Sequence, residues 1–357
     1  MKKLFSIVLV VVLLVSMLSL AGCQAKTYEL AMITDVGDID DKSFNQGTWE
    51  GLRDYAVEHK ITHKYYKPLE VSTDAYLSAI DLAVSSGAKV IVTPGFMFEE
   101  AIFIAQDRYP EVMFILLDGQ PQDADYNKRI EKNVYAVIYA EEHCGYLAGY
   151  AAVVDGYRNL GYQGGMAVPA VCRYGFGFVQ GANDAAKELG LAKGDVKIMY
   201  NYSGDFADTP ASQTRAAGWY QAGTEVIFAA GGKVGNSVMS AAEAANKAVI
   251  GVDVDQSAES PTVISSAMKG LATMVQYGLK EFYAGKFPGG QVVTVGAESN
   301  AVSLAPFSTS KWKTFSQADY DALFAKLANG TLAPEKDNDR TNPTELKLDY
   351  VKLTFVE

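Results

Sequence analysis

The stretch that follows the first predicted strand is rich in acidic residues. Four aspartates lie between residues 35 and 41, directly before Ser43-Phe44-Asn45. Clustered carboxylates are typical of a calcium loop, but an EF-hand requires alternating acidic positions, a central glycine and a distant glutamate. The spacing here lacks that pattern, so an EF-hand calcium site is not expected.

Phe44 and Asn45 form a pair whose chemistry suits a planar polar ring. An aromatic face stacks on a base, and a side-chain amide offers both a donor and an acceptor to a base edge. Ser43, just before them, is a favourable N-cap residue for a helix that begins here. An aromatic at this position is equally consistent with core packing, and core packing is the preferred interpretation of Tyr174 and Phe176 in a later helix.

Two other segments place polar or small residues directly after predicted strands. Asp118 closes an apolar strand, and open α/β sheets bind ligands at the carboxyl ends of their strands. Gly231 and Gly232 are either turn glycines or a place where the backbone approaches a ligand. They do not form a phosphate loop, because Gly232-Lys233 lacks the earlier glycine and the following Ser or Thr that such a loop requires.

The histidines and cysteines give no indication of a metal centre, and no cofactor is expected. His59, His63 and His143 lack the spacing of metal ligands. Cys144 and Cys172 both fall in segments predicted to be packed. Two buried thiols are therefore favoured over the alternative, a disulfide between them.

The N-terminus has the order of a secretory signal peptide. Met1-Lys2-Lys3 precedes an apolar run from Leu4 to Leu20, and Leu20-Ala21-Gly22-Cys23 follows. The last four residues resemble the lipobox of bacterial lipoproteins, which implies that residues 1–22 are removed, that Cys23 is lipidated and that residues 23–27 form a tether. The alternative is a short membrane helix with an incidental cysteine, but a spanning helix needs about 20 apolar residues and this run has roughly 15.

The charge of the mature chain is strongly acidic. Removing residues 1–22 takes away Lys2 and Lys3 and no acidic residue, so the formal net charge falls from −11 to −13. An acidic surface argues against nucleic acid or an anionic membrane as the ligand.

From Tyr28 onward, short apolar runs alternate with longer amphipathic ones, the pattern of βα units in a parallel sheet. A first set predicts strands at 29–34, 62–67, 89–93 and 112–117, with helices at 43–58, 74–86 and 98–109. A second set predicts strands at 162–168, 196–200, 225–229 and 248–252, with helices at 174–189, 210–221 and 236–245. Each set has the length of a small domain.

The remaining segments connect the two sets. Residues 134–139 predict a strand that leads into a helix at 141–154, where the chain passes from the first set to the second. Later segments predict an extended piece at 262–266, a long helix at 269–283, strands at 291–295 and 301–304, a surface helix at 316–329 and a final strand near 346–355.

Assigning the long helix to the first set gives two Rossmann-like lobes joined by several crossovers. We expect residues 28–138 plus about 262–305 to form lobe 1, and residues 139–261 plus about 306–357 to form lobe 2. The predicted fold class is α/β, the type I periplasmic-binding-protein fold, with a hinge and an interlobe cleft that holds the ligand.

A series of segments resembles the basic membrane protein family of lipoproteins, of the purine nucleoside receptor (PnrA-like) type. They are, in chain order, Asp35 to Gln46, Gly95-Phe96, Tyr146 to Tyr150, Gly164 to Met166, Arg173 to Gly175, Gly177-Phe178, Gly204 to Asp208, Ala229 to Gly232, Gly251 to Gln256 and Ser265 to Lys269. They span nearly the whole mature chain in the order of the family. The resemblance therefore implies the two-lobed fold as well as a function.

For the base, the resemblance implies that Phe44 and Phe206, one from each lobe, sandwich a purine ring. It implies that Asn45 and Asp118 form hydrogen bonds to the base edge. Local sequence alone is also consistent with Phe206 as an ordinary buried aromatic after a strand.

For the sugar, the resemblance implies that Asp35, Gly231, Gly232, Asp253 and Lys269 hold the hydroxyls and frame the pocket. A carboxylate suits a sugar diol because it accepts two charge-assisted hydrogen bonds. Lys269 follows Asp253 by 16 positions and is expected to offset its charge.

The function implied by this resemblance is capture of a purine nucleoside for an ABC importer, without catalysis. The implied partners are the permease subunits and, through the lipid anchor, the outer face of the cell membrane; a monomer is expected. Three alternatives stay open: a binder of riboflavin or another small molecule, a surface adhesin, and a nucleoside-cleaving enzyme. The lipobox and the lack of a histidine positioned at the cleft argue against the enzyme.

Overall fold

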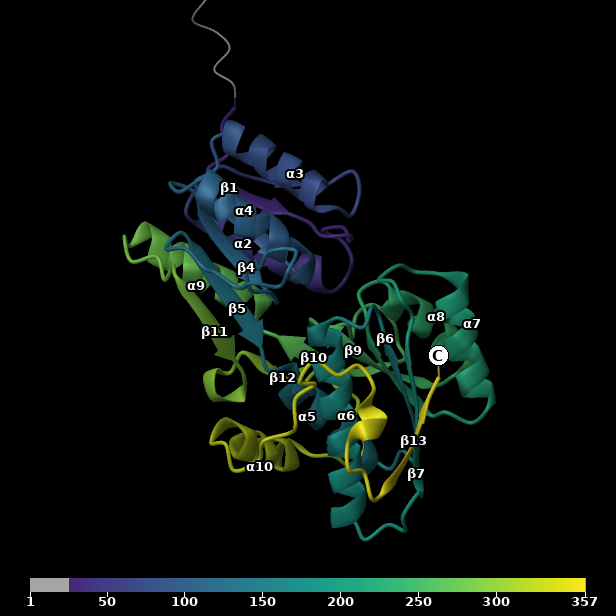
Figure 1. Cartoon of the computed structure of the whole chain (residues 1–357). Coiled ribbons are helices and arrows are strands. Elements are labelled where there is room, and N and C mark those ends of the chain that lie inside the picture. The colour runs from purple at the N-terminus through teal and green to yellow at the C-terminus, as the bar shows by residue number, and fades with distance from the viewer. Residues whose placement is uncertain (1–25, 357) are drawn as a thin grey trace, which may run out of the picture.

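The computed structural model describes residues 26–356, and the predicted signal peptide and Cys23 lie outside this range. The chain folds into two α/β lobes, one above the other in Figure 1. Over the described residues, every helix is too short or too polar to cross a bilayer.

The first lobe contains a parallel sheet of six strands in the order β11-β5-β4-β3-β1-β2. In chain order these are β1 (Leu30–Ile33), β2 (His63–Tyr66), β3 (Val90–Pro94), β4 (Met113–Leu117), β5 (Val134–Tyr139) and β11 (Gln291–Val295). The helices of this lobe are α2 (Phe44–Glu58), α3 (Thr73–Ser85), the short η1 (Phe96–Phe98), α4 (Glu99–Arg108) and α9 (Leu271–Tyr283). The inner strands are apolar and buried along their length, as expected for a parallel sheet covered on both faces.

The second lobe contains a sheet of seven strands in the order β12-β10-β9-β8-β6-β7-β13, parallel except for the edge pair β10-β12. Its strands are β6 (Asn159–Gly164), β7 (Val196–Tyr202), β8 (Val226–Ala230), β9 (Ala248–Asp253), β10 (Val263–Lys269), β12 (Val302–Leu304) and β13 (Val351–Phe355). Its helices are α5 (Glu141–Val154), α6 (Pro169–Glu188), α7 (Pro210–Gln221), α8 (Val234–Ala245) and α10 (Gln317–Ala328), with short turns at η2 (Ala297–Ser299) and η3 (Pro343–Glu345).

The backbones of α5 and α6 pack in direct contact. A side chain at Gly145 would come within 2.2 Å of the carbonyl oxygen of Tyr174, and one at Gly149 within 2.0 Å of the carbonyl oxygen of Phe178. Only glycine permits such an approach. This contact fixes the start of α5, which follows the first crossover between the lobes, against α6.

The chain crosses between the lobes three times, and the second and third crossovers differ from the predicted boundaries. Strand β10 pairs in parallel with β9, and β12 pairs with β10, so residues 263–269 and 302–304 belong to the second sheet. Only the segment that carries α9 and β11 returns to the first lobe. The sequence analysis assigned the extended piece at 262–266 to the first lobe, together with the helix that follows it. In the structure this piece is β10, and it pairs with β9, the strand that precedes it in the chain, as consecutive strands usually do.

One predicted strand is also shifted. The expected strand at 162–168 is β6 at Asn159–Gly164, and α6 begins at Pro169 instead of Tyr174. Proline favours the first turn of a helix, where its missing N–H costs nothing, and that signal marks the true start.

Candidate functional site

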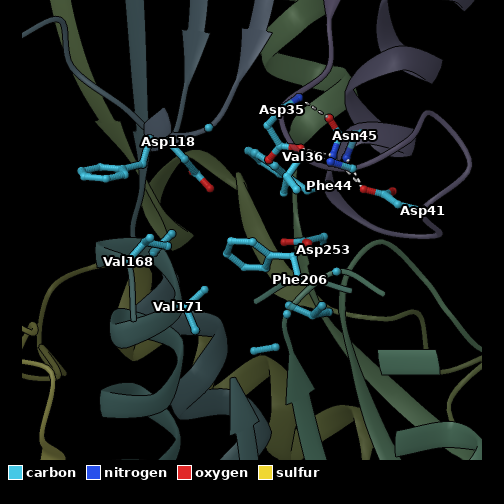
Figure 2. Close-up of a pocket in the computed structure, with 18 of the residues that line it drawn as sticks. Asp35, Val36, Asp41, Phe44, Asn45, Asp118, Val168, Val171, Phe206 and Asp253 are labelled. Carbon is cyan, nitrogen blue, oxygen red and sulfur yellow. Dashed lines mark hydrogen bonds between the residues drawn. The ribbon is translucent and has the colours of Figure 1, made fainter. Parts of the chain in front are cut away.

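A cavity lies between the carboxyl ends of the two sheets, with about 750 Å³ of empty space that includes the solvent at its open mouth. This is where open α/β sheets bind ligands. All nine side chains or glycines that the sequence singles out line it: Asp35, Phe44, Asn45, Asp118, Phe206, Gly231, Gly232, Asp253 and Lys269. Figure 2 shows Phe44 on the upper lobe and Phe206 on the lower lobe beside the same space, with Asp118 across from Asp35.

The two aromatic rings reach the cavity from different lobes. Phe44 begins α2, and the ammonium of Lys269 lies 4.8 Å from the centre of its ring. Phe206 lies in the loop after β7, against Gly165, where a side chain would come within 2.4 Å of the Phe206 ring. Both residues are only partly buried, so part of each stays accessible from the cavity.

The glycine pair after β8 has two structural reasons to be glycine. A side chain at Gly231 would come within 2.5 Å of the backbone nitrogen of Gly165, and Gly232 adopts a left-handed conformation with φ of 55°. Gly232 also lies beside Phe206. Close backbone packing at Gly231 and turn geometry at Gly232 thus both favour glycine in this pair.

Lys269, at the end of β10, is the centre of a buried charge cluster. Its Nζ atom pairs with Asp118 and lies 3.1 Å from Glu141 Oε1 and 3.7 Å from Asp253 Oδ1. Arg173 on α6 pairs with the other oxygen of Glu141 at 2.5 Å. Three carboxylates therefore share two cations in a site screened from water. The predicted proximity of Lys269 to Asp253 is observed, whereas the role of Glu141 and Arg173 was not foreseen.

This cluster leaves Asp118 with an unusual carboxyl group. Burial raises its pKa to about 7, because desolvation and the neighbouring Glu141 outweigh the attraction of Lys269. Its Oδ1 atom is buried and has no hydrogen-bond partner among the described residues. A buried polar atom of this kind is costly unless a partner reaches it. Asp118 also has a left-handed backbone, with φ of 55°, which turns the chain sharply at the end of β4.

Asn45 is held by its neighbours in a way the sequence did not reveal. Its amide nitrogen donates to Asp35 Oδ1 at 2.8 Å and to Asp41 Oδ2 at 2.9 Å, and its oxygen accepts from the backbone N–H of Asp35 at 3.2 Å. The two N–H donors are thus already used, and only the oxygen keeps a free lone pair. Burial raises the pKa of Asp35 to about 6, although hydrogen bonds from Gly37 and Asn45 oppose the shift.

Ser43 occupies the N-cap position of α2, as predicted, but its side chain does not cap the helix. The Asp41 carboxylate, not the serine hydroxyl, accepts from the first free N–H groups of α2, those of Asn45 and Gln46, at 3.0 Å each. The Ser43 hydroxyl instead donates to Asp253 in the other lobe. The cap is therefore local, but it comes from Asp41 and not from the N-cap residue itself.

The cavity wall includes residues that the sequence did not assign to it. These are Val36, Gly37, Asp41, Gly95, Phe96, Met97, Val168, Ala170, Val171, Tyr174, Ala230, Lys233 and Val252. Tyr174 serves both the core and the site, since it is buried and its hydroxyl donates to Asp253 at 3.2 Å, while Phe176 lies wholly in the core. Val168 and Val171 lie at the start of α6, and proline at its first turn was the signal that could have located them.

The remaining reactive side chains do not form a second centre. Among residues 26–356, no group of three or more His, Cys, Asp or Glu side chains is arranged to hold a metal ion. Cys144 and Cys172 are both buried free thiols, in agreement with the preferred prediction. Burial raises the pKa of Cys172 to about 11, so this thiol is a poor nucleophile at neutral pH.

Comparison with known proteins gives a consistent result. Residues 28–328 match the family described as ABC transporter substrate-binding protein PnrA-like. The chain is 30% identical over 325 residues to the ABC transporter nucleoside-binding protein BmpA of Lactococcus lactis subsp. cremoris (strain MG1363), covering 82% of this chain and 88% of the relative. It is 28% identical over 305 residues to basic membrane protein B of Borreliella burgdorferi, covering 82% of this chain and 86% of the relative.

The fold is also found among solved structures. An ABC transporter solute-binding protein from Aeropyrum pernix K1 superposes with a TM-score of 0.78 at 21% identity, covering 89% of this chain and 96% of that one. Identity at this level supports the fold alone. The predicted α/β fold of the type I periplasmic-binding-protein kind is confirmed.

Proposed function

The chain belongs to the PnrA-like family of ABC transporter substrate-binding proteins, and from this premise we propose that it captures purine nucleosides for an importer without chemically changing them. The observation that carries the proposal is the pair Phe44 and Phe206, which reach one cavity from opposite lobes. A flat ring between them would bind both faces at once. Stacking on one aromatic face is worth about 1–3 kcal/mol per base, so two faces tie affinity to closure of the lobes.

The polar groups around the rings suit a nucleoside better than a fully apolar ligand. In this proposal Asp118 accepts hydrogen bonds from the base edge, since its Oδ1 atom is buried and lacks a partner in the described chain. Asn45 contributes its remaining acceptor and holds Asp35 in place. Asp118 and Asp35 offer acceptors, so the ligand must supply N–H or O–H donors.

The sugar is assigned to a second set of residues that line the same cavity. Asp253 and Lys269 at the ends of β9 and β10, together with Asp35 and the pair Gly231-Gly232, would receive the ribose hydroxyls. A carboxylate paired with a lysine is well suited to a diol, because one group accepts and the other donates.

The cellular setting follows from the same proposal. A lipid on Cys23 would tether a monomeric receptor at the extracytoplasmic face of the cell membrane, near the permease subunits that receive the ligand. The basic start, the apolar run and Leu20-Ala21-Gly22 directly before that cysteine support the anchor. The L. lactis relative, named as a nucleoside-binding protein, supports the choice of ligand.

Calorimetric titration of the purified chain with a panel of ligands tests the proposal. Adenosine, guanosine and inosine should bind, cytidine and the free bases should bind more weakly, and riboflavin should not compete. Tight binding of riboflavin instead, or release of free base with turnover when inosine is added, would contradict it. Binding of none of these ligands would favour the surface adhesin.

A further inference from the structure

Ser43 lies at the seam between the lobes, where its hydroxyl donates to the Oδ2 atom of Asp253. Ser43 precedes α2 in the first lobe, and Asp253 ends β9 in the second, 210 positions later in the chain. Ser43 is fully buried and Asp253 is 6% exposed. This is a buried hydrogen bond to a charged group, which is stronger than a neutral one.

The hydroxyl is free to make this bond because Asp41 has taken over its usual task. The Asp41 carboxylate accepts from the backbone N–H groups of Ser43 at 2.9 Å and of Asn45 and Gln46 at 3.0 Å. An N-cap serine ordinarily accepts such bonds itself. Asp41 therefore satisfies the helix end and leaves Ser43 available to the other lobe.

Asp253 has a conformation that needs support from several sides. Its backbone is left-handed, with φ of 66°, a region that side-chain-bearing residues rarely adopt. Within its own lobe, the Oδ1 atom accepts from the Tyr174 hydroxyl at 3.2 Å and lies 3.7 Å from Lys269 Nζ. Ser43 is the partner of the other oxygen, Oδ2, and it comes from the opposite lobe.

A second contact joins the same two segments. Gln256, three residues after Asp253, donates its amide to the backbone oxygen of Lys42 at 2.7 Å. Lys42 also has a left-handed backbone, with φ of 60°. The loop before α2 is thus hydrogen-bonded to the segment around the end of β9 at two neighbouring positions, Ser43–Asp253 and Lys42–Gln256.

We propose that Ser43 is a positioning residue that orients the Asp253 carboxylate only when the lobes are closed, and so couples closure to recognition of the sugar hydroxyls. This inference rests on the proposed function, in which Asp253 contacts the sugar. In the open protein Asp253 lacks its first-lobe partner, and in the closed protein one oxygen is fixed by Ser43 while the other faces Tyr174 and Lys269.

Titration of the full mature chain and its Ser43→Ala variant with inosine and with hypoxanthine tests the proposal. The variant should bind inosine at least fivefold more weakly, mainly through faster dissociation, and hypoxanthine less than twofold more weakly. Ser43→Thr keeps the hydroxyl and should recover at least half of the loss. Equal losses for nucleoside and base, or unchanged inosine affinity, would overturn the inference.

Ser72→Ala is the matched control. The Ser72 hydroxyl accepts from the backbone N–H of Ala75 and caps α3 in the same lobe, away from the seam. Its removal should lower the melting temperature and leave inosine affinity unchanged, the reverse of the pattern expected for Ser43→Ala.

Small-angle scattering of the ligand-free proteins separates this inference from the proposed function. Ser43→Ala should show a larger radius of gyration than the wild type, because the closed state has lost an interlobe bond. If the wild type binds no nucleoside, the proposed function fails. If the wild type and the variant also scatter identically, the present inference fails as well.

Discussion

In the proposed function, the two aromatic residues carried by different lobes favour a flat ligand in the cavity. Phe206 packs against Gly165 and Gly232, and a side chain at Gly165 would collide with its ring. Phe206→Ala should weaken binding of inosine and adenosine by at least tenfold, because one stacked face is worth about 1–3 kcal/mol. Calorimetry measures the loss. Phe206→Tyr keeps the aromatic face and should bind within about threefold of the wild type; equal weakening in both variants would contradict stacking.

The carboxyl group of Asp118 in the cavity links the stability of the fold to pH. Its folded pKa, about 7, lies above the ordinary value of 3.8. The folded protein therefore holds this proton more tightly than the unfolded chain, and stability falls as pH rises from about 4 to about 7. The same sign applies to Glu99 and Glu142, whose pKa values are each raised by burial to about 7.

Replacing Asp118 with asparagine should remove part of that pH dependence. The amide of the Asp118→Asn variant retains an oxygen for Lys269, while Glu141 continues to balance the lysine charge. At pH 8 the free energy of unfolding should rise by on the order of 2 kcal/mol, and at pH 4 it should hardly change. Urea denaturation at both pH values measures this. An Asp118→Asn protein that is less stable than the wild type at pH 8 would show that the charge on Asp118 stabilises the fold.

Secondary-structure elements with strong local signals agreed closely with their sequence prediction. The bounds of β5, α5, α7 and β11 match their predicted ranges. The interpretation failed where neighbours in space decide. Strand β10 was placed in the wrong lobe because its serines pair with β9 inside the second sheet, a choice that local pattern does not record.

The candidate site, like the fold, was predicted where local sequence decides and missed where residues distant in the chain make contact. The nine predicted residues line one cavity. Local pattern placed Asp35, Phe44, Asn45 and Asp118 after strands or at the start of a helix, whereas the family resemblance supplied Phe206, Asp253 and Lys269 and the roles of all nine. Apart from the proximity of Lys269 to Asp253, their mutual contacts were not predicted. The pair Lys269–Asp118 is 151 positions apart in the chain, and the Ser43–Asp253 bond joins residues 210 positions apart.

The contact between α5 and α6 should depend on glycine. A methyl group at Gly149 would come within 2.0 Å of the Phe178 carbonyl, so Gly149→Ala should separate the helices and destabilise the protein by more than about 2 kcal/mol. Gly218→Ala is the control: Gly218 lies in α7 with nothing near its added methyl, and the change should stabilise by about 0.5–1 kcal/mol through helix propensity. Thermal unfolding of both variants decides, and equal effects would contradict backbone contact as the cause.

At the scale of the whole molecule, the lobes are joined by three chain crossovers and by side-chain contacts along the edge of α2. Lys233 of the second lobe lies 3.0 Å from Asp38 of the first, and Gln256 holds the backbone of Lys42. These contacts exist only when the lobes lie together. They therefore favour the closed state and oppose release of a ligand to a transporter.

Asp38 forms one ion pair across the lobes and one inside the first lobe, so the effect of each pair on dissociation of the ligand can be compared. Its carboxylate pairs with Lys233 across the seam and with Lys67 inside the first lobe. Both lysines are partly exposed, so each pair is worth at most about 1 kcal/mol. Lys233→Met should raise the dissociation rate of a bound nucleoside about two- to fivefold, and Lys67→Met should change it by less than about 1.5-fold, because only the first change loosens the closed state.

Ionic strength adds a second test of the same pair. Screening weakens exposed ion pairs, so raising salt from about 0.05 to 0.5 M should speed dissociation from the wild type and from Lys67→Met more than from Lys233→Met, in which the exposed Lys42–Glu259 pair still joins the lobes. Stopped-flow release of a fluorescent nucleoside measures these rates. If both variants release ligand equally fast, the Lys233–Asp38 contact does not contribute to closure. If only Lys233→Met is fast and less sensitive to salt than the wild type, opening of the lobes limits release, and weakening of this ion pair is one of the changes by which a transporter could trigger it.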